Sequence, residues 1–337
     1  MTGAARSVRL VQLAAGAERR VALVDEPHLR PLRAPGSVFE LAMRAAATGR
    51  GIAGIALDAA IDDRLAYDEV YEGKSQWRLL PPIDHPEPAR CLVSGTGLTH
   101  LGSARDRDAM HAPDDREATD SMRMFRAGLE GGRPEPGTTG AAPEWFYKGT
   151  GHALRTHGEP LIVPPFAEDG GEEAEIAGIY VIDPDGRPRR VGMTAGNEFS
   201  DHAYERRNYL HLAGSKLRTC AIGPEIVLNP AFESVAGEVT IERTGARLWE
   251  KHIESGSDAM CHSLANIEHH HFKFEGHRRP GDVHVHFFGA HSLSFGDGVV
   301  LEDGDVMGVR FDGFGRALRN PVRVDRRAAA AVIVLAL

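Results

Sequence analysis

Three glutamates gather in the stretch GGEEAEIAG, residues 170–178, at the start of the apolar run IAGIYVI. Side chains two residues apart lie on the same face of a β-strand, so we expect Glu173 and Glu175 to project side by side. Two carboxylates that close require either protonation of one of them or a neutralising cation. An all-oxygen site suits Mg²⁺, Mn²⁺ or Ca²⁺ rather than zinc. From the spacing alone, solvent-exposed glutamates at a strand start are the simpler interpretation.

A second polar group follows at residues 192–227 and favours the metal interpretation. Asn197 and Glu198 come directly after a predicted strand and a glycine. Lys216 follows further along, just before a strand start at GPEIV. A buried site with several carboxylates and a nearby lysine has the residue types needed for acid–base chemistry at a metal.

The composition is typical of a soluble globular protein of 337 residues, with 26% charged and 7% aromatic residues. A net charge of −9 disfavours nucleic acid and anionic membranes as partners, so an anionic substrate would need a local positive centre. Cys91, Cys220 and Cys261 lack CxxC spacing, which indicates a reducing compartment and no thiolate metal site. The N-terminus has no signal-peptide pattern, and we expect a cytoplasmic protein.

The elements that position these residues are predicted as a small α/β domain at 1–80 and a mainly β domain at 81–327. Alternating residues at 6–13 and 19–26 predict a hairpin, and residues 37–49 predict a helix capped by Ser37 and Gly49. Four prolines in 79–90 exclude regular structure, which places the domain boundary there. The predicted fold class is α+β, mainly β.

The second half of the chain is predicted as short strands interrupted by a single helix at 263–277, with a hairpin turn at 184–186. Residues 105–142 form a long polar loop with one helix near 118–132, and the loop is either a functional lid or disordered. The apolar tail at 328–337 is about half as long as a bilayer span requires. We expect it to pack on the fold or on a partner subunit, or to be frayed.

These motifs resemble those of the fumarylacetoacetate hydrolase superfamily. EAEIAGIYVI, GNEFSD, GSKLRT, GPEIV, RPGDV and LEDGDVMGVRFDGFGRALRNPV occur in the same order and at about the same spacing. VSGTGLTH and PEWFYK fit the upstream motifs more loosely, and the similarity runs from about Val93 to Val324. The first 80 residues resemble only the small N-terminal domain that many members carry. Within the superfamily the chain is most similar to the sugar-acid dehydratases.

The resemblance implies a β-roll catalytic domain that holds one Mg²⁺ or a similar ion. The family's Glu-x-Glu pair falls on Glu173 and Glu175, and its third ligand, usually Asp, falls on Glu198. The longer glutamate is a departure that requires its loop to lie further back. The active-site lysine falls on Lys216, and the catalytic glutamate of the related dehydratases falls on Glu144. With the pair facing a cation, we expect the neighbouring Glu172 to point the other way and to be solvated.

The expected activity is that of a metal-dependent hydro-lyase acting on a 2-keto-3-deoxy sugar acid, such as a 2-keto-3-deoxypentonate of the arabinonate type, to give 2,5-dioxopentanoate. A divalent ion would polarise the 2-oxo acid. Lys216 would take a proton from C3, provided that burial or the nearby cation favours its neutral amine, or would only clamp the substrate carboxylate. Glu144 would be the general acid. Members of the superfamily are often homodimers, which is our expectation here.

Two alternatives remain from the sequence. Hydrolases or decarboxylases of this superfamily act on acylpyruvates, and the hydrolases use a His-x-x-Glu dyad to activate water. His100 falls on that histidine, but Ser103 stands where the glutamate would be, so dehydration is favoured and His100 could have no role. A non-catalytic sugar-acid binding protein is disfavoured, because it would not need Lys216 beside three acidic ligands.

Several histidines lie outside these motifs. Three consecutive histidines, His269 to His271, point in different directions on a helix, so a zinc site is not expected, although His269 or His270 could face the cavity. His284 and His286 lie on one strand face, where packing or a subunit contact is the simpler interpretation.

Overall fold

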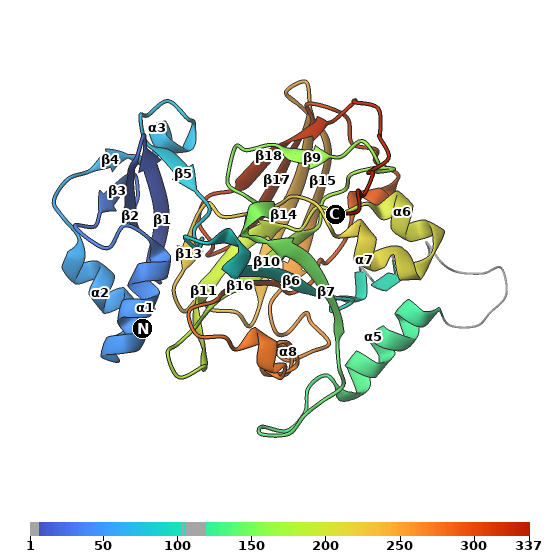
Figure 1. Ribbon diagram of the computed structural model, residues 1–337, viewed down its shortest axis with the longest axis horizontal. Coiled ribbons are helices and arrows are strands. Elements are labelled where there is room, and N and C mark those ends of the chain that lie inside the picture. The colour runs from blue at the N-terminus through green and yellow to red at the C-terminus, as the bar shows by residue number, and fades with distance from the viewer. Residues whose placement is uncertain (1–6, 103, 106–118) are drawn as a thin grey trace.

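Two β-sheets form the framework of the computed structural model, which describes residues 7–102, 104–105 and 119–337 (Figure 1). In this part of the chain the larger sheet has thirteen strands and the smaller has five. The larger sheet contains β1 (Arg9–Ala15), β2 (Glu18–Asp25), β3 (His28–Pro31), β4 (Leu65–Ala66), β5 (Arg78–Leu80), β6 (Cys91–Gly97), β7 (Glu144–Thr150), β8 (Leu154–Arg155), β10 (Ala174–Ile182), β11 (Pro188–Asn197), β12 (Cys220–Ile222), β13 (Ile226–Val227) and β16 (Val283–Phe287). The smaller contains β9 (Leu161–Val163), β14 (Val235–Arg243), β15 (Ala246–Ser255), β17 (Val306–Phe311) and β18 (Leu318–Val324). The predicted α+β, mainly β class is confirmed.

The helices lie around the sheets and are short. Among the described residues they include α1 (Val38–Thr48), α2 (Ile52–Ala59), α3 (Tyr67–Tyr71), α5 (Asp120–Gly131), α6 (His202–Arg207), α7 (Leu212–Ser215) and α8 (Leu264–Phe272). The capped helix predicted at 37–49 is confirmed as α1. The Ser37 side chain accepts a hydrogen bond from the Glu40 N–H, and Gly49 ends the helix in the left-handed conformation. The predicted hairpin of two N-terminal strands is confirmed as β1 and β2.

The order of strands across the larger sheet is β4-β3-β2-β1-β13-β11-β10-β16-β6-β7. The N-terminal strands therefore continue the sheet of the second half of the chain, because Arg9 pairs with Val227 across β1 and β13. A buried carboxylate ties the same parts together. Glu225 accepts hydrogen bonds from the Arg9 guanidinium at 2.9 Å and from the Tyr67 hydroxyl at 2.9 Å.

Strand β10 lies at the centre of the molecule and is buried along its whole length. Ile179 faces a core that contains Leu41 of α1 and Ile55 of α2. Ile176 faces the opposite core, which contains Val309 of β17 and other side chains of the smaller sheet. A strand covered on both faces is apolar at successive positions rather than alternating, which accounts for the run IAGIYVI. Polar side chains at its beginning are therefore enclosed by the fold.

One expectation about the second half of the chain needs correction, and one of the alternatives for the tail is excluded. Residues 202–215, expected to be without helix, contain α6 and α7, and α6 begins where the Asp201 side chain accepts a hydrogen bond from the Tyr204 N–H. The apolar tail does not pack on the fold, since Val332 to Leu335 are at least 80% exposed. Contact of the tail with a partner subunit stays a prediction. Within the described ranges, no helix has the length and apolarity that crossing a bilayer would take.

Candidate active site

The β10–β11 hairpin brings three glutamates together. Glu173 and Glu175 lie at the start of β10, and Glu198 follows the end of β11. The register pairs Ala174 with Asn197, and the Glu198 N–H donates to the Glu173 carbonyl at 2.9 Å. All three side chains are buried, and one carboxylate oxygen from each lies within 4.8 Å of the others. The three residues predicted as metal ligands are thus adjacent in space.

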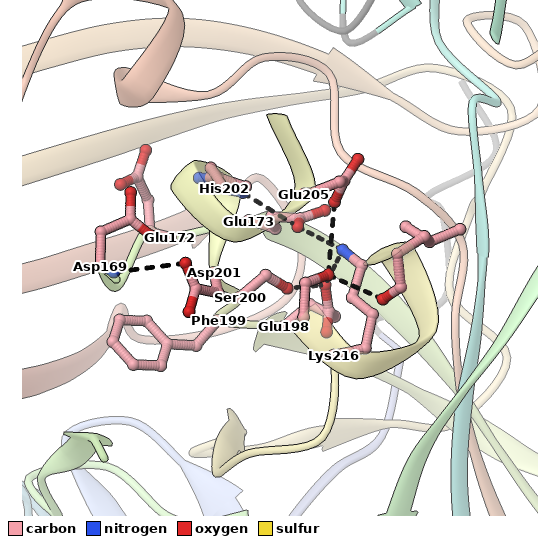
Figure 2. A network of polar contacts seen from close by, with 12 residues as sticks. Asp169, Glu172, Glu173, Glu198, Phe199, Ser200, Asp201, His202, Glu205 and Lys216 are labelled. Atoms are coloured by element: carbon pink, nitrogen blue, oxygen red, sulfur yellow. Dashed lines mark hydrogen bonds and ion pairs between the residues drawn. The ribbon is translucent and has the colours of Figure 1, made fainter. Parts of the chain in front are cut away.

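Lys216 lies against two of these carboxylates (Figure 2). Its ammonium donates to Glu173 Oε1 and, at 2.5 Å, to Glu198 Oε2. The side chain is almost completely buried, and its Nζ atom lies 4.8 Å from the centre of the Phe146 ring. The residue directly follows α7. The structure therefore places Lys216 beside the glutamates, where its motif predicted it.

A second lysine, which the sequence analysis missed, contacts the same group of carboxylates. Lys148 Nζ lies 2.6 Å from Glu198 Oε1 and also donates to the Phe199 carbonyl. Burial lowers the pKa of Lys148, although Glu198 acts in the opposite direction. The sequence PEWFYK could have indicated the position of Lys148. Glu144, Phe146 and Lys148 alternate with exposed residues along β7 and so share its buried face.

The surroundings of Glu175 disfavour its charged form when no cation is bound. Burial raises the pKa of Glu175 well above its ordinary value, and the nearby carboxylates of Glu173 and Glu198 raise it further, although Lys216 acts against them. Glu175 Oε2 accepts a hydrogen bond from the Gly289 N–H at 2.7 Å. A divalent ion would remove the repulsion among the carboxylates, and oxygen donors of this kind suit Mg²⁺, Mn²⁺ or Ca²⁺. The residues present therefore fit the predicted metal.

Further polar side chains surround the glutamates (Figure 2). Ser200 donates to Glu198 Oε2 at 2.7 Å, and His202 Nε2 lies 3.1 Å from Glu173 Oε1. Burial alone would lower the pKa of His202, but its hydrogen bond to Glu173 shifts the pKa above the ordinary value. None of these outer contacts was predicted from the sequence.

The expectation that Glu172 is solvated is wrong. Its side chain is buried and accepts two hydrogen bonds from Ser294, from the backbone N–H at 2.8 Å and from the hydroxyl at 2.6 Å. Burial raises the pKa of Glu172, and the two Ser294 bonds partly counter this effect. Because β10 is covered on both faces, the side of the strand opposite the metal ligands also lies inside the protein.

Glu144 and His100 are both buried, but in different surroundings. Glu144 begins β7, on the strand face that also carries Phe146 and Lys148, and accepts a hydrogen bond from the Tyr209 hydroxyl at 3.1 Å. His100 Nδ1 lies 2.8 Å from the Thr99 hydroxyl, and burial lowers the pKa of His100 to about 3. Position 103, where a hydrolase would have its glutamate, lies outside the described residues.

The histidines of α8 and β16 that the sequence analysis singled out lie in polar and ring contacts or on the surface. His271 Nε2 lies 2.9 Å from His284 Nδ1, and the His286 ring lies between the hydroxyls of Ser94 and Thr96. His269 is exposed on α8. Among the described residues, the glutamate trio is the one group of three or more potential ligands close enough to share a metal. For His284 and His286 the structure shows contacts within one chain, and a subunit contact stays a prediction.

Comparison with solved structures finds this fold in several enzymes. The structure of 2-keto-3-deoxy-D-arabinonate dehydratase complexed with magnesium and 2,5-dioxopentanoate matches with a TM-score of 0.70 and 20% identity, covering 95% of this chain and 100% of that chain. Fumarylacetoacetate hydrolase from psychrophilic Exiguobacterium antarcticum matches with a TM-score of 0.60 and 18% identity, with the same coverage of both chains. 2-Hydroxyhepta-2,4-diene-1,7-dioate isomerase from Mycobacterium marinum matches with a TM-score of 0.57 and 17% identity, also with the same coverage of both chains. No family model matches the chain, and no curated protein sequence is significantly similar.

The chain therefore has the fold of fumarylacetoacetate hydrolase, as its motifs predicted. Within that fold class, its TM-scores are higher with the structures of 2-keto-3-deoxyarabinonate dehydratase, at 0.70 to 0.71, than with the hydrolase and the isomerase above. At sequence identities of 17–20% these structural matches show a common fold and nothing more, and one fold can carry different reactions. The activity has to be argued from the residues of the site.

Proposed function

We propose that this protein is a divalent-metal-dependent hydro-lyase that removes water from a 2-keto-3-deoxy sugar acid. The observation that carries the proposal is the buried trio of Glu173, Glu175 and Glu198 with Lys216 in contact with two of its members. The likeness in fold to a dehydratase solved with magnesium and 2,5-dioxopentanoate supports the choice of substrate class. The particular substrate that we propose is a 2-keto-3-deoxypentonate of the arabinonate type.

Glu173, Glu175 and Glu198 would hold the cation, for which Mg²⁺ is our first choice and Mn²⁺ or Ca²⁺ the alternatives. When bound, the ion would supply a Lewis acid that stabilises negative charge on the 2-oxo group of the substrate. The burial of all three carboxylates keeps bulk water from weakening these electrostatic interactions.

Lys216 is proposed as the base that takes a proton from C3. In the structure its ammonium is the charge partner of Glu173 and Glu198. Once these carboxylates are committed to a cation, Lys216 loses its charge partners, and a positive charge nearby favours the neutral amine. A neutral amine beside the 2-oxo group can accept the C3 proton, which that group acidifies.

Glu144 is proposed as the acid that protonates the departing C4 hydroxyl. It lies on the buried face of β7, and Phe146 of that face also contacts Lys216. The C3 proton goes to Lys216, and the C4 oxygen leaves as water with the proton from Glu144. The unsaturated 2-oxo acid that remains becomes 2,5-dioxopentanoate by proton shifts that convert its C5 alcohol into an aldehyde. This route needs no water nucleophile.

The proposal is tested by offering the purified protein a panel of 2-keto-3-deoxy sugar acids and acylpyruvates with Mg²⁺. Mass spectrometry of the products separates loss of one water, expected of a dehydratase, from gain of one water, expected of a hydrolase. Faster cleavage of acylpyruvates than dehydration of any sugar acid would favour the hydrolase alternative. Tight binding of a sugar acid without turnover would favour a binding protein.

A further inference from the structure

His202 is directed at one oxygen of a proposed metal ligand (Figure 2). It is the first residue of α6, and its side chain is 1% exposed. Its Nε2 atom lies 3.1 Å from Glu173 Oε1, the oxygen that Lys216 also contacts. Two donors on one oxygen restrict the rotation of the Glu173 carboxylate about its long side chain. The other oxygen is then held in a defined direction relative to Glu175 and Glu198.

The glycine pair that precedes the glutamates makes room for this contact. A Cβ atom on Gly171 would lie 2.2 Å from His202 Nδ1, and one on Gly170 would lie 2.5 Å from the Phe199 ring. Gly171 and Ser200 also exchange two backbone hydrogen bonds of 2.9 Å, which draw α6 against the start of β10. The segment GG in GGEEAEIAG is therefore needed for His202 to reach Glu173.

The far side of the imidazole is packed rather than hydrogen-bonded. The Phe295 ring lies 5.4 Å from the His202 ring, on the loop that Glu172 anchors through Ser294. Among the described residues, His202 Nδ1 is buried and has no hydrogen-bond partner. The hydrogen bond to Glu173 is thus the polar contact that fixes the orientation of this ring.

We propose that His202 is a positioning residue that holds Glu173 in the orientation required to bind the divalent cation. The inference rests on the metal site of the proposed function and goes beyond it, because it names an outer residue that sets the affinity for the ion. Side chains that orient metal ligands typically change metal affinity by about 10–100-fold when they are removed.

Isothermal titration calorimetry of Mg²⁺ into metal-stripped protein tests this role in three variants. His202→Leu removes the donor and is expected to weaken Mg²⁺ binding by ~10–100-fold. His202→Gln keeps an N–H donor on a side chain of similar reach and should restore part of the affinity. Gly171→Ala leaves His202 in the sequence but pushes its ring away, so it should weaken binding as His202→Leu does.

The control is His211→Gln, because His211 Nδ1 lies near the Tyr204 carbonyl and not near the carboxylates. This variant should bind Mg²⁺ like the wild type. Binding within about twofold of wild type in both His202→Leu and Gly171→Ala would overturn the inference and leave the proposed function standing. A lower melting temperature of the metal-free variants with unchanged Mg²⁺ affinity would also overturn it, by showing a purely structural role. If the wild type binds none of Mg²⁺, Mn²⁺ and Ca²⁺, the proposed function fails as well.

Discussion

Replacing Glu172 by alanine should destabilise the protein, although this glutamate is neither a proposed ligand nor a proposed catalyst. The change leaves the Ser294 N–H and hydroxyl without the carboxylate that accepts both of their hydrogen bonds. A buried donor without a partner costs ~1–3 kcal/mol, and the hydroxyl can turn toward another acceptor, so we expect a loss of ~2–4 kcal/mol. An unfolding entropy of roughly 2 cal/mol/K per residue converts this loss into a fall of ~3–6 °C in melting temperature for 337 residues.

Differential scanning calorimetry in the presence of a chelator measures this effect without a contribution from the metal site. Glu254→Ala is a matched control, since Glu254 lies exposed on β15, and it should change stability by less than ~0.5 kcal/mol. Glu172→Gln retains an acceptor for the Ser294 N–H, so its melting temperature should lie between those of Glu172→Ala and Glu254→Ala. A melting temperature of Glu172→Ala within about 1 °C of wild type would refute the reasoning, because it would mean that the two Ser294 bonds contribute almost nothing.

The other predictions concern the site and the acid stability of the protein. Glu175→Gln should abolish Mg²⁺ binding in calorimetry without lowering the metal-free melting temperature, because burial and neighbouring carboxylates already disfavour its charge. Lys216→Ala should stop turnover and retain Mg²⁺ binding, whereas only a few-fold loss of kcat would show that it merely positions substrate. Glu144→Gln should block water loss but allow slow exchange of C3 protons with deuterium, followed by NMR. Burial lowers the pKa of His284 and of His286 to about 3, so on acidification these histidines take up protons in the unfolded chain before they do so in the folded protein. Each histidine should therefore lower the free energy of unfolding by ~2 kcal/mol between pH 7 and pH 5, as measured by urea unfolding.

The parts of the site that follow local rules could be predicted from the sequence. Glu173 and Glu175 are related by the two-residue period of a strand, and a short hairpin turn at 184–186 brings Glu198 back beside them. Lys216 was found by its place in a motif. No local rule connects it to the glutamates, because α6 and α7 intervene and both helices are too short to show a periodic pattern.

The sequence analysis misjudged Glu172 because both faces of its strand are buried. Glu172 was expected to be solvated because Glu173 was assigned to the interior, an argument that holds only for a sheet with one wet face. The unbroken apolar run after it already indicated two covered faces. Lys148 was missed for a different reason. The alternation in PEWFYK places Lys148 on the same strand face as Glu144, and the sequence analysis did not draw that consequence.

The pairing of β1 with β13 limits how this protein can be divided or recombined. A chain that began at residue 81 would lack the strand that pairs with β13, and Glu225 would lose its hydrogen bonds from Arg9 and Tyr67. The Arg316 N–H would still donate to Glu225, but losing the charge partner of a buried carboxylate costs several kcal/mol. We therefore expect that the first 80 residues cannot be exchanged as an independent module. A relative's N-terminal segment grafted onto residues 81–337 would have to bring its own arginine and tyrosine to the same carboxylate.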